Sequence, residues 1–279
     1  MNDPILVTGA TGPHGNAVAH ALLSAGRDVR ALTRDAASAK AQALAVAGAR
    51  LAVGDLLEAE SLSSAMDGIG AVYAVTTPFG GNGPELEVEQ GRQLITAALA
   101  AEIPWFIFAS VGDANVATGV PHFESKGQIE RLLADTALAH TTVAPTYFYE
   151  NVGDVPAIAD AGELVMALPA DQPLQQVSLA DLGSVVVAIL GRRDEFLGAR
   201  VDVAGDHPTP TQMAAALQMA TGKPVNFRQR PISEVAERNH DLGAMYRFLS
   251  DVGYSADSDA VRARFPEVSF QSFADWLAR

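Results

Sequence analysis

The feature that most constrains the fold is a repeated alternation of short apolar segments with helix-length segments. A β-prone stretch at residues 5–8 precedes three glycines, and apolar residues then recur at helical spacing up to Gly26. Further strands are expected at residues 29–33, 50–53, 71–75, 105–109 and 141–144, separated by helix-length segments at 36–47, 58–67, 85–101 and 124–139. This alternation is typical of βαβ units, whose right-handed crossovers place helices on both faces of a parallel sheet. We therefore predict a doubly wound α/β fold.

Beyond Pro145 the alternation stops, and prolines are scattered through shorter segments. A helix at 182–190 and a strand at 200–203 are expected to return to the main sheet. The remainder is expected to hold a capped helix at 209–222, a strand at 225–228 and a helix from Ser233. The predicted main domain takes residues 1–150 with 177–204, and a smaller α/β lobe that covers the substrate takes residues 151–176 and 205–279.

Composition excludes several classes of function. The 33 Asp and Glu against 19 Lys and Arg give a net charge of −14, which repels nucleic-acid backbones and anionic lipid surfaces. The absence of cysteine removes disulfides and thiolate chemistry, and the histidines outside the motifs below lack metal-ligand spacing, so no metal site is expected. No basic leader and no apolar run of about 18 residues occurs. We expect a cytoplasmic monomer or homodimer with no direct nucleic-acid or membrane contact.

The glycine loop between the first strand and the first helix is the strongest local signal for a ligand. Glycines there let backbone N–H groups approach a pyrophosphate, and the helix N-terminus adds a partial positive charge. The loop residues expected to contact phosphates are Gly9, Thr11, Gly12, Pro13, His14 and Gly15. The alternative for the whole loop is a tight turn without a ligand. The alternative for His14 is a solvated side chain on the first helical turn.

The end of the second strand distinguishes between dinucleotides. A carboxylate there binds a free ribose 2′-hydroxyl, whereas an arginine accommodates a 2′-phosphate. Thr33 is followed by Arg34, so NADP(H) is favoured, with NAD(H) as the alternative. Asp35 lies near the position of a ribose-binding acid, and we interpret it as a first-turn carboxylate of the next helix. Lys40 either adds charge to the phosphate site or is a solvated helix lysine.

The glycine spacing GATGPHG resembles the loop of atypical short-chain dehydrogenase/reductases. The stretches VRALTRD, GDL, AVTTPF, FIFAS, VPHFESKGQIERLL, APTYFYENV, QQVSLADLG and FADWL extend this likeness over essentially the whole chain. Together they are similar to the NmrA-like NAD(P)-binding family. The resemblance implies a Rossmann dinucleotide-binding domain.

Related folds bind the adenine next to a residue that follows the third strand, where this chain has Asp55 and Leu56. Asp55 also fits a helix cap. At the carboxyl edge of the fourth strand, the residues expected to line the ribose and nicotinamide are Thr76, Thr77, Pro78 and Phe79. The glycine-rich loop at 80–84 is either a lid or a plain surface connection.

Short-chain dehydrogenases use a serine after the fifth strand and a tyrosine four residues before a lysine. Ser110 and Lys126 occupy the serine and lysine positions, but His122 stands where the tyrosine is expected. The resemblance implies that Lys126 binds the nicotinamide ribose. Because the pKa of a phenol is about 10 and that of imidazole about 6.5, histidine is no simple substitute for tyrosine. His122 is either a proton donor or a structural residue at the helix start.

Tyr147, Phe148 and Tyr149 cluster after the sixth strand, where aromatic rings could stack on a nicotinamide or a flat substrate. We assign Tyr147 to the cofactor and substrate side and Asn151 to the turn, while core packing explains at least one of the rings. The predicted activity is hydride transfer from NADPH to a small flat acceptor such as a quinone, with Lys126, His122 and Tyr147 as catalytic candidates. The alternative is a non-catalytic sensor of NAD(P) state that acts through a protein partner.

Overall fold

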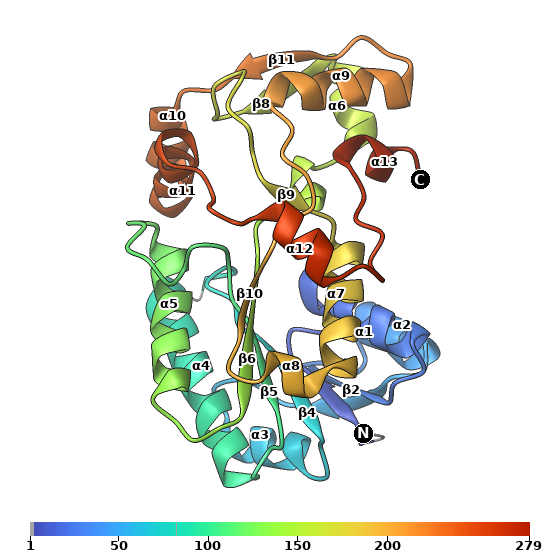
Figure 1. The fold of residues 1–279 in the computed structure, drawn as a ribbon, viewed down its shortest axis with the longest axis vertical. Coiled ribbons are helices and arrows are strands. Elements are labelled where there is room, and N and C mark those ends of the chain that lie inside the picture. Colours follow the sequence, from blue (N-terminus) through green and yellow to red (C-terminus); the bar gives the residue numbers. More distant parts are fainter. Residues whose placement is uncertain (1–2, 82) are drawn as a thin grey trace.

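The computed structural model describes residues 3–81 and 83–279. A seven-stranded sheet forms the lower part of the molecule in Figure 1, in the order β10-β6-β5-β4-β1-β2-β3. Its strands are β1 (Ile5–Val7), β2 (Val29–Thr33), β3 (Arg50–Val53), β4 (Ala71–Val75), β5 (Phe106–Ala109), β6 (His140–Pro145) and β10 (Arg200–Val203). All neighbours are parallel, with Ile5 of β1 paired to Val29 and to Ala71. The expected return of residues 200–203 to this sheet is observed.

Helices cover both faces of the sheet. One apolar cluster joins the sheet to α1 (Pro13–Ser24), α2 (Ala39–Val46), α7 (Leu179–Gly191), α8 (Arg193–Phe196) and α12 (Ser258–Arg264). The other joins it to α3 (Ala59–Met66), α4 (Gly83–Ala100) and α5 (Pro121–Ala134). Leu6 packs into the second cluster and its neighbours Ile5 and Val7 into the first, as the period of a strand requires. The prediction of a doubly wound α/β fold is confirmed.

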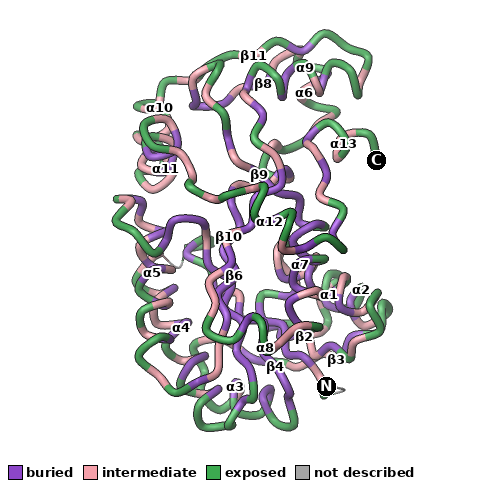
Figure 2. The backbone as a smooth tube through the Cα atoms, viewed as in Figure 1, coloured by how far each residue is buried: buried purple, intermediate pink, exposed green. Residues whose placement is uncertain are grey.

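A smaller lobe lies above the carboxyl edge of the sheet (Figure 1). It contains the two parallel strands β8 (Glu163–Met166) and β11 (Asn226–Gln229), with α6 (Val155–Ala161), α9 (Pro210–Thr221), α10 (Ile232–Arg238), α11 (His240–Asp251) and α13 (Phe273–Leu277). The short strands β7 (Tyr147–Phe148) and β9 (Gln176–Val177), with the 3-10 turn η1 (Tyr149–Val152), connect it to the main sheet. Figure 2 shows buried backbone concentrated on the central strands and beneath the lobe.

Several predicted boundaries are wrong for identifiable reasons. The helix expected at 36–47 begins at Ala39, because the Ser38 side chain caps it by accepting from the backbone N–H of Ala41. The helix expected at 124–139 begins at Pro121, whose fixed φ suits the first helical turn. The helix expected from Ser233 is divided in two, since Asn239 caps a second helix, α11. The division of residues between two domains stays a prediction.

No helix in the described part of the chain has the length and apolar character to cross a bilayer. Among the same residues, no group of three His, Cys, Asp or Glu is arranged to hold a metal ion.

Candidate functional site

A cavity of about 890 Å³ extends along the carboxyl edge of the main sheet and beneath α11. The sequence-predicted residues that line it are Gly9, Thr11, Gly12, Pro13, His14, Gly15, Arg34, Asp55, Leu56, Thr76, Thr77, Pro78, Phe79, Ser110, His122, Lys126 and Tyr147. The lobe contributes Leu242, Met245, Tyr246 and Tyr254. The parallel strands therefore bring into one site the residues that sequence reasoning singled out one by one, and their roles stay predictions.

The glycine loop folds tightly over the start of α1. Gly9 has a φ of +59°, and the Gly12 N–H donates to the Gly9 carbonyl at 2.9 Å. A Cβ on Gly15 would lie 2.4 Å from that same carbonyl oxygen, so only glycine fits there. Gly12 at the N-cap offers no side-chain acceptor to the first N–H groups of the helix. This is the arrangement that an anionic ligand can complete.

Arg34 and Asp35 take different positions. Arg34 is exposed at the rim of the cavity, among its lining residues. Asp35 precedes the helix and accepts from the backbone N–H of Ala37 at 2.8 Å, so its assignment to the first helical turn is wrong. The reason is the cap at Ser38, which starts α2 later than expected. Asp35 and Lys40 are not among the residues that line the cavity.

The helix-cap alternative for Asp55 is wrong, because α3 begins at Ala59 with Glu58 at its N-cap position. Oδ1 of Asp55 accepts from the Leu57 backbone N–H at 2.9 Å, which stabilises the turn before α3. Asp55 lines the cavity together with Leu56.

His14 is half-buried, so the solvated alternative is wrong. Its Nε2 is 2.7 Å from the Tyr73 hydroxyl, and its ring lies edge-on to Tyr73 and Phe148. Burial, reinforced by the charge of Lys126, lowers the pKa of His14 to about 3. The imidazole is therefore neutral at pH 7.

Lys126 on α5 pairs with a carboxylate that sequence reasoning missed. Its Nζ lies 2.9 Å from Oε1 of Glu87, a residue of α4 with 0% exposure. The Thr76 hydroxyl donates to the same oxygen at 2.9 Å, and the Ser125 hydroxyl donates to Oε2. The available signal was the position of Glu87 on the apolar face of its helix, among the buried residues Gln90, Gly91, Leu94, Ile95 and Ala98.

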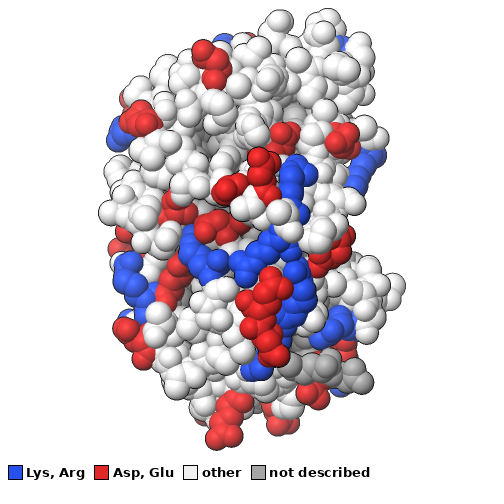
Figure 3. All heavy atoms as spheres, in the orientation of Figure 1, with Lys and Arg blue, Asp and Glu red and all other residues white. Residues whose placement is uncertain are grey.

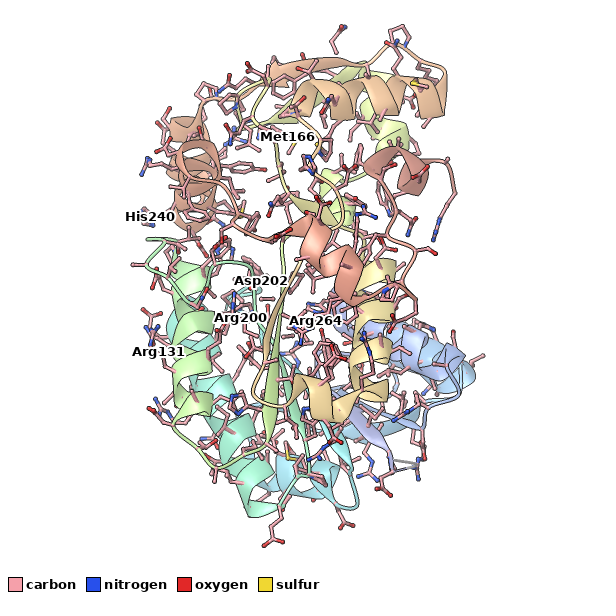
Figure 4. The ribbon with its side chains drawn as sticks, viewed as in Figure 1. Arg131, Met166, Arg200, Asp202, His240 and Arg264 are labelled. Atoms are coloured by element: carbon pink, nitrogen blue, oxygen red, sulfur yellow. The ribbon has the colours of Figure 1, made fainter. Side chains whose placement is uncertain are left out.

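Ser110 lines the cavity, but its hydroxyl donates to Oε1 of Glu130. The same Glu130 oxygen accepts from Nη1 of Arg200 at 2.6 Å. The Nη2 group of Arg200 donates to the carbonyl of Val111 at 3.0 Å. Figure 4 shows Arg200 beside Asp202 on β10. Nη2 of Arg200 lies 2.9 Å from Oδ1 of Asp202. The Ser110 hydroxyl therefore belongs to an ion-pair network that fastens α5 to the edge of the sheet.

His122 is joined to the lobe by a second unpredicted carboxylate. Its Nδ1 lies 2.6 Å from Oδ1 of Asp241 on α11, and its backbone N–H donates to the same oxygen at 3.3 Å. Burial pushes the pKa of the Asp241 carboxyl up, but the hydrogen bond and charge of His122 more than offset this and hold that pKa below its usual range. The Phe79 ring lies 5.5 Å from the imidazole, centroid to centroid. His122 and Asp241 are 119 positions apart in the sequence, so no local pattern could have predicted their contact.

The aromatic residues after β6 divide between the cavity and the core. Tyr147 lines the cavity with Tyr246 and Tyr254, and burial, followed by the neighbouring Tyr246, raises the pKa of Tyr147. Tyr149 is fully buried and donates to the Gln271 carbonyl at 3.0 Å, so it is the ring explained by core packing. Asn151 lines the cavity at the turn η1.

The described residues of the loop at 80–84 are not among those that line the cavity. Gly80 and Gly81 are exposed, and Asn82 lies outside the described residues. The choice between a lid and a surface connection stays open.

Figure 3 shows a band of basic side chains across the middle of this face, with acidic side chains above and below it. Arginines of the chain that pair with carboxylates include Arg192 with Glu195 at 3.1 Å and Arg264 with Glu195 at 3.2 Å.

Comparison with known proteins identifies the relatives of this chain. It is 30% identical over 224 residues to an NAD(P)H azoreductase of Xenophilus azovorans, covering 80% of this chain and 76% of that one. Its structure superposes on the NADPH complex of an NADPH-dependent quinone oxidoreductase of Escherichia coli with a TM-score of 0.80, 24% identity and 98% coverage of both chains. NmrA, a negative transcriptional regulator solved in complex with NADP, gives a TM-score of 0.81 at 19% identity, covering 100% of this chain and 95% of that one.

The family model described as the NmrA-like family matches residues 1–276. The resemblance found in the glycine loop and the HFESK segment is confirmed. Since the match extends over nearly the whole chain, this protein belongs to the NmrA-like family.

Proposed function

We propose that this protein is an NADPH-dependent oxidoreductase that transfers a hydride to a small flat acceptor such as a quinone. The observation that carries the proposal is one continuous cavity that joins the glycine loop and Arg34 to an aromatic chamber, with Lys126 between them. The names of an azoreductase and of a quinone oxidoreductase among the relatives support it. When bound, NADPH would supply the hydride.

The residues of the cavity fit a dinucleotide. A Cβ on Gly15 would collide with the backbone carbonyls of Gly9 and Thr8, so glycine there lets α1 begin close against β1 and keeps the loop tight. Arg34 at the rim would bind a 2′-phosphate, and Asp55 with Leu56 would border the adenine. Lys126 would bind the nicotinamide ribose, and Glu87 would orient its ammonium group while neutralising its charge.

The acceptor would lie in the chamber formed by Phe79, His122, Tyr147, Tyr246 and Tyr254. These aromatic side chains suit a flat, apolar molecule. The chain lacks the tyrosine that reduces ketones in short-chain dehydrogenases. A quinone gains aromatic stabilisation on reduction, so it depends less on a strong proton donor than a ketone does.

The second candidate is a sensor of NAD(P) state that acts through a protein partner. The replacement of the expected tyrosine by His122 favours it, as does the kinship with NmrA, a negative transcriptional regulator. The two functions differ in what happens after the cofactor binds.

The test is NADPH oxidation with a panel of simple quinones. We expect oxidation faster than that of NADPH in buffer, with a rate that saturates in the quinone. Tight NADPH binding without turnover on a broad quinone and aldehyde panel would instead support the sensor. In that case, sizing or scattering should differ between the NADP-bound and empty protein.

Arg34→Ala should remove the preference for NADPH over NADH. A charge-assisted contact with the 2′-phosphate contributes about 1.5–3 kcal/mol, which corresponds to a preference of about 10- to 100-fold in the unmodified protein. Calorimetric titration with both cofactors measures this ratio. Lys40→Ala is the matched control, because this exposed lysine lies outside the cavity lining. Equal affinity of the unmodified protein for the two cofactors would contradict the assignment of Arg34.

A further inference from the structure

We propose that His122 and Asp241 act as a pair that delivers the proton required for quinone reduction, so that α11 of the lobe completes the active site. This inference rests on the proposed function. It assigns the proton donor as His122 and adds Asp241 as the residue that positions it.

The geometry of the pair is that of an oriented imidazole. Oδ1 of Asp241 is 2.6 Å from Nδ1 of His122 and also accepts the His122 backbone N–H at 3.3 Å. One carboxylate oxygen thus fixes both the ring and its peptide. An acceptor at Nδ1 places a proton on that nitrogen and directs Nε2 as the group available for exchange.

The second ring nitrogen, Nε2, makes no hydrogen bond to any residue that the structure describes, and the imidazole lines the cavity. The rings of Phe79 and Phe123 hold it from two sides, at centroid distances of 5.5 and 4.7 Å. The His122 side chain is 9% exposed, so the ring has little freedom to turn away from the chamber. Figure 4 labels His240 at the start of α11, where this helix meets the segment that leads into α5.

The reaction consumes one proton that a positioned donor can supply. Transfer of a hydride to a quinone adds two electrons and one proton and leaves a hydroquinone monoanion. A proton from Nε2 of the His122 imidazolium completes the neutral hydroquinone, and solvent then returns a proton to the imidazole. The Asp241 carboxylate, bonded at Nδ1, keeps the ring in place while the proton leaves Nε2.

Four other hydrogen-bonding groups near the chamber are less suited to this role. Burial raises the pKa of Tyr147 and of Tyr254, which makes both phenols poorer acids. His14 is neutral at pH 7 and hydrogen-bonded to Tyr73. Lys126 is held by Glu87.

The experiment compares two hydride acceptors that differ in their need for a proton. A naphthoquinone needs one, whereas the flat 10-methylacridinium cation becomes neutral on accepting a hydride and needs none. General acids contribute about 10²–10⁴-fold, so His122→Gln should lower kcat/KM for the quinone about 100-fold and that for acridinium less than about threefold. Asp241→Asn should lower kcat/KM for the quinone about tenfold and leave kcat/KM for acridinium nearly unchanged. His207→Gln, which changes an exposed histidine outside the cavity lining, is the control and should alter neither.

Imidazole rescue provides a second readout if the protein does not accept acridinium. Added imidazole should restore quinone turnover in His122→Ala by about tenfold or more. Equal losses with both acceptors in His122→Gln, or quinone turnover unchanged in His122→Ala, would overturn the proposal. An unmodified protein that reduces no acceptor contradicts the proposed function itself, which separates the two failures.

Discussion

Gly15→Ala should weaken NADPH binding by about 100-fold or more. The added Cβ would lie 2.4 Å from the Gly9 carbonyl oxygen and 2.8 Å from that of Thr8. Both are backbone atoms, so the glycine loop itself must move. A loss of 100-fold corresponds to about 2.7 kcal/mol, within the usual cost of overpacking a close contact.

Gly191→Ala is the matched control for this variant. Gly191 also lies in a helix, α7, but a Cβ there would meet nothing within 4 Å. Its NADPH affinity should equal that of the unmodified protein. Isothermal titration of both variants gives the comparison, and unfolding curves verify that Gly15→Ala is folded. A folded Gly15→Ala protein with full NADPH affinity would place the pyrophosphate somewhere other than the glycine loop.

Glu87→Leu should have two effects. It should lower the free energy of unfolding by about 3 kcal/mol, and it should weaken NADPH binding. Glu87 is fully buried, and its removal leaves Lys126 without a counter-charge and the Thr76 hydroxyl without its carboxylate acceptor. Removing one partner of a buried ion pair typically costs about 3–5 kcal/mol, and the lower value suits a lysine side chain that is 13% exposed. Urea unfolding measures the stability.

A double variant separates the structural role of this pair from its binding role. In Glu87→Leu combined with Lys126→Met, no charge is left unpaired, so most of the stability should return. NADPH affinity should stay low, because the lysine that would bind the ribose is absent. Recovery of affinity in the double variant would show that Lys126 does not contact the cofactor.

The parts of the fold that sequence reasoning predicted depend on local patterns. The glycines before α1 and the apolar strands can be recognised because each pattern is formed by residues that lie close together in the sequence. The carboxyl edge of a parallel sheet then collects the residues that follow each strand, so Thr76, Ser110 and Tyr147 reach one cavity.

The carboxylates that complete the site depend on long-range contacts. Glu87 lies on an acid-rich helical turn, where a solvated face is the ordinary interpretation, and its partner Lys126 is 39 residues away. Asp241 meets His122 only because α11 of the lobe packs against α5. The helix start at Ala39 was not predicted because the sequence offers two residues that could precede the helix. Asp35 forms a turn with Ala37, and Ser38 caps the helix.

In the proposed reaction, a bound cofactor gives its hydride directly to an acceptor held on one side of the nicotinamide. The most direct measurement repeats the quinone assay with NADPH deuterated at either one of the two C4 positions of its nicotinamide, and determines by mass spectrometry the deuterium that remains in the NADP product. We expect complete loss of deuterium from one of the two labelled cofactors and complete retention in the other, because a fixed nicotinamide presents a single face to the chamber. Similar partial loss from both, or no quinone-dependent product at all, would contradict it.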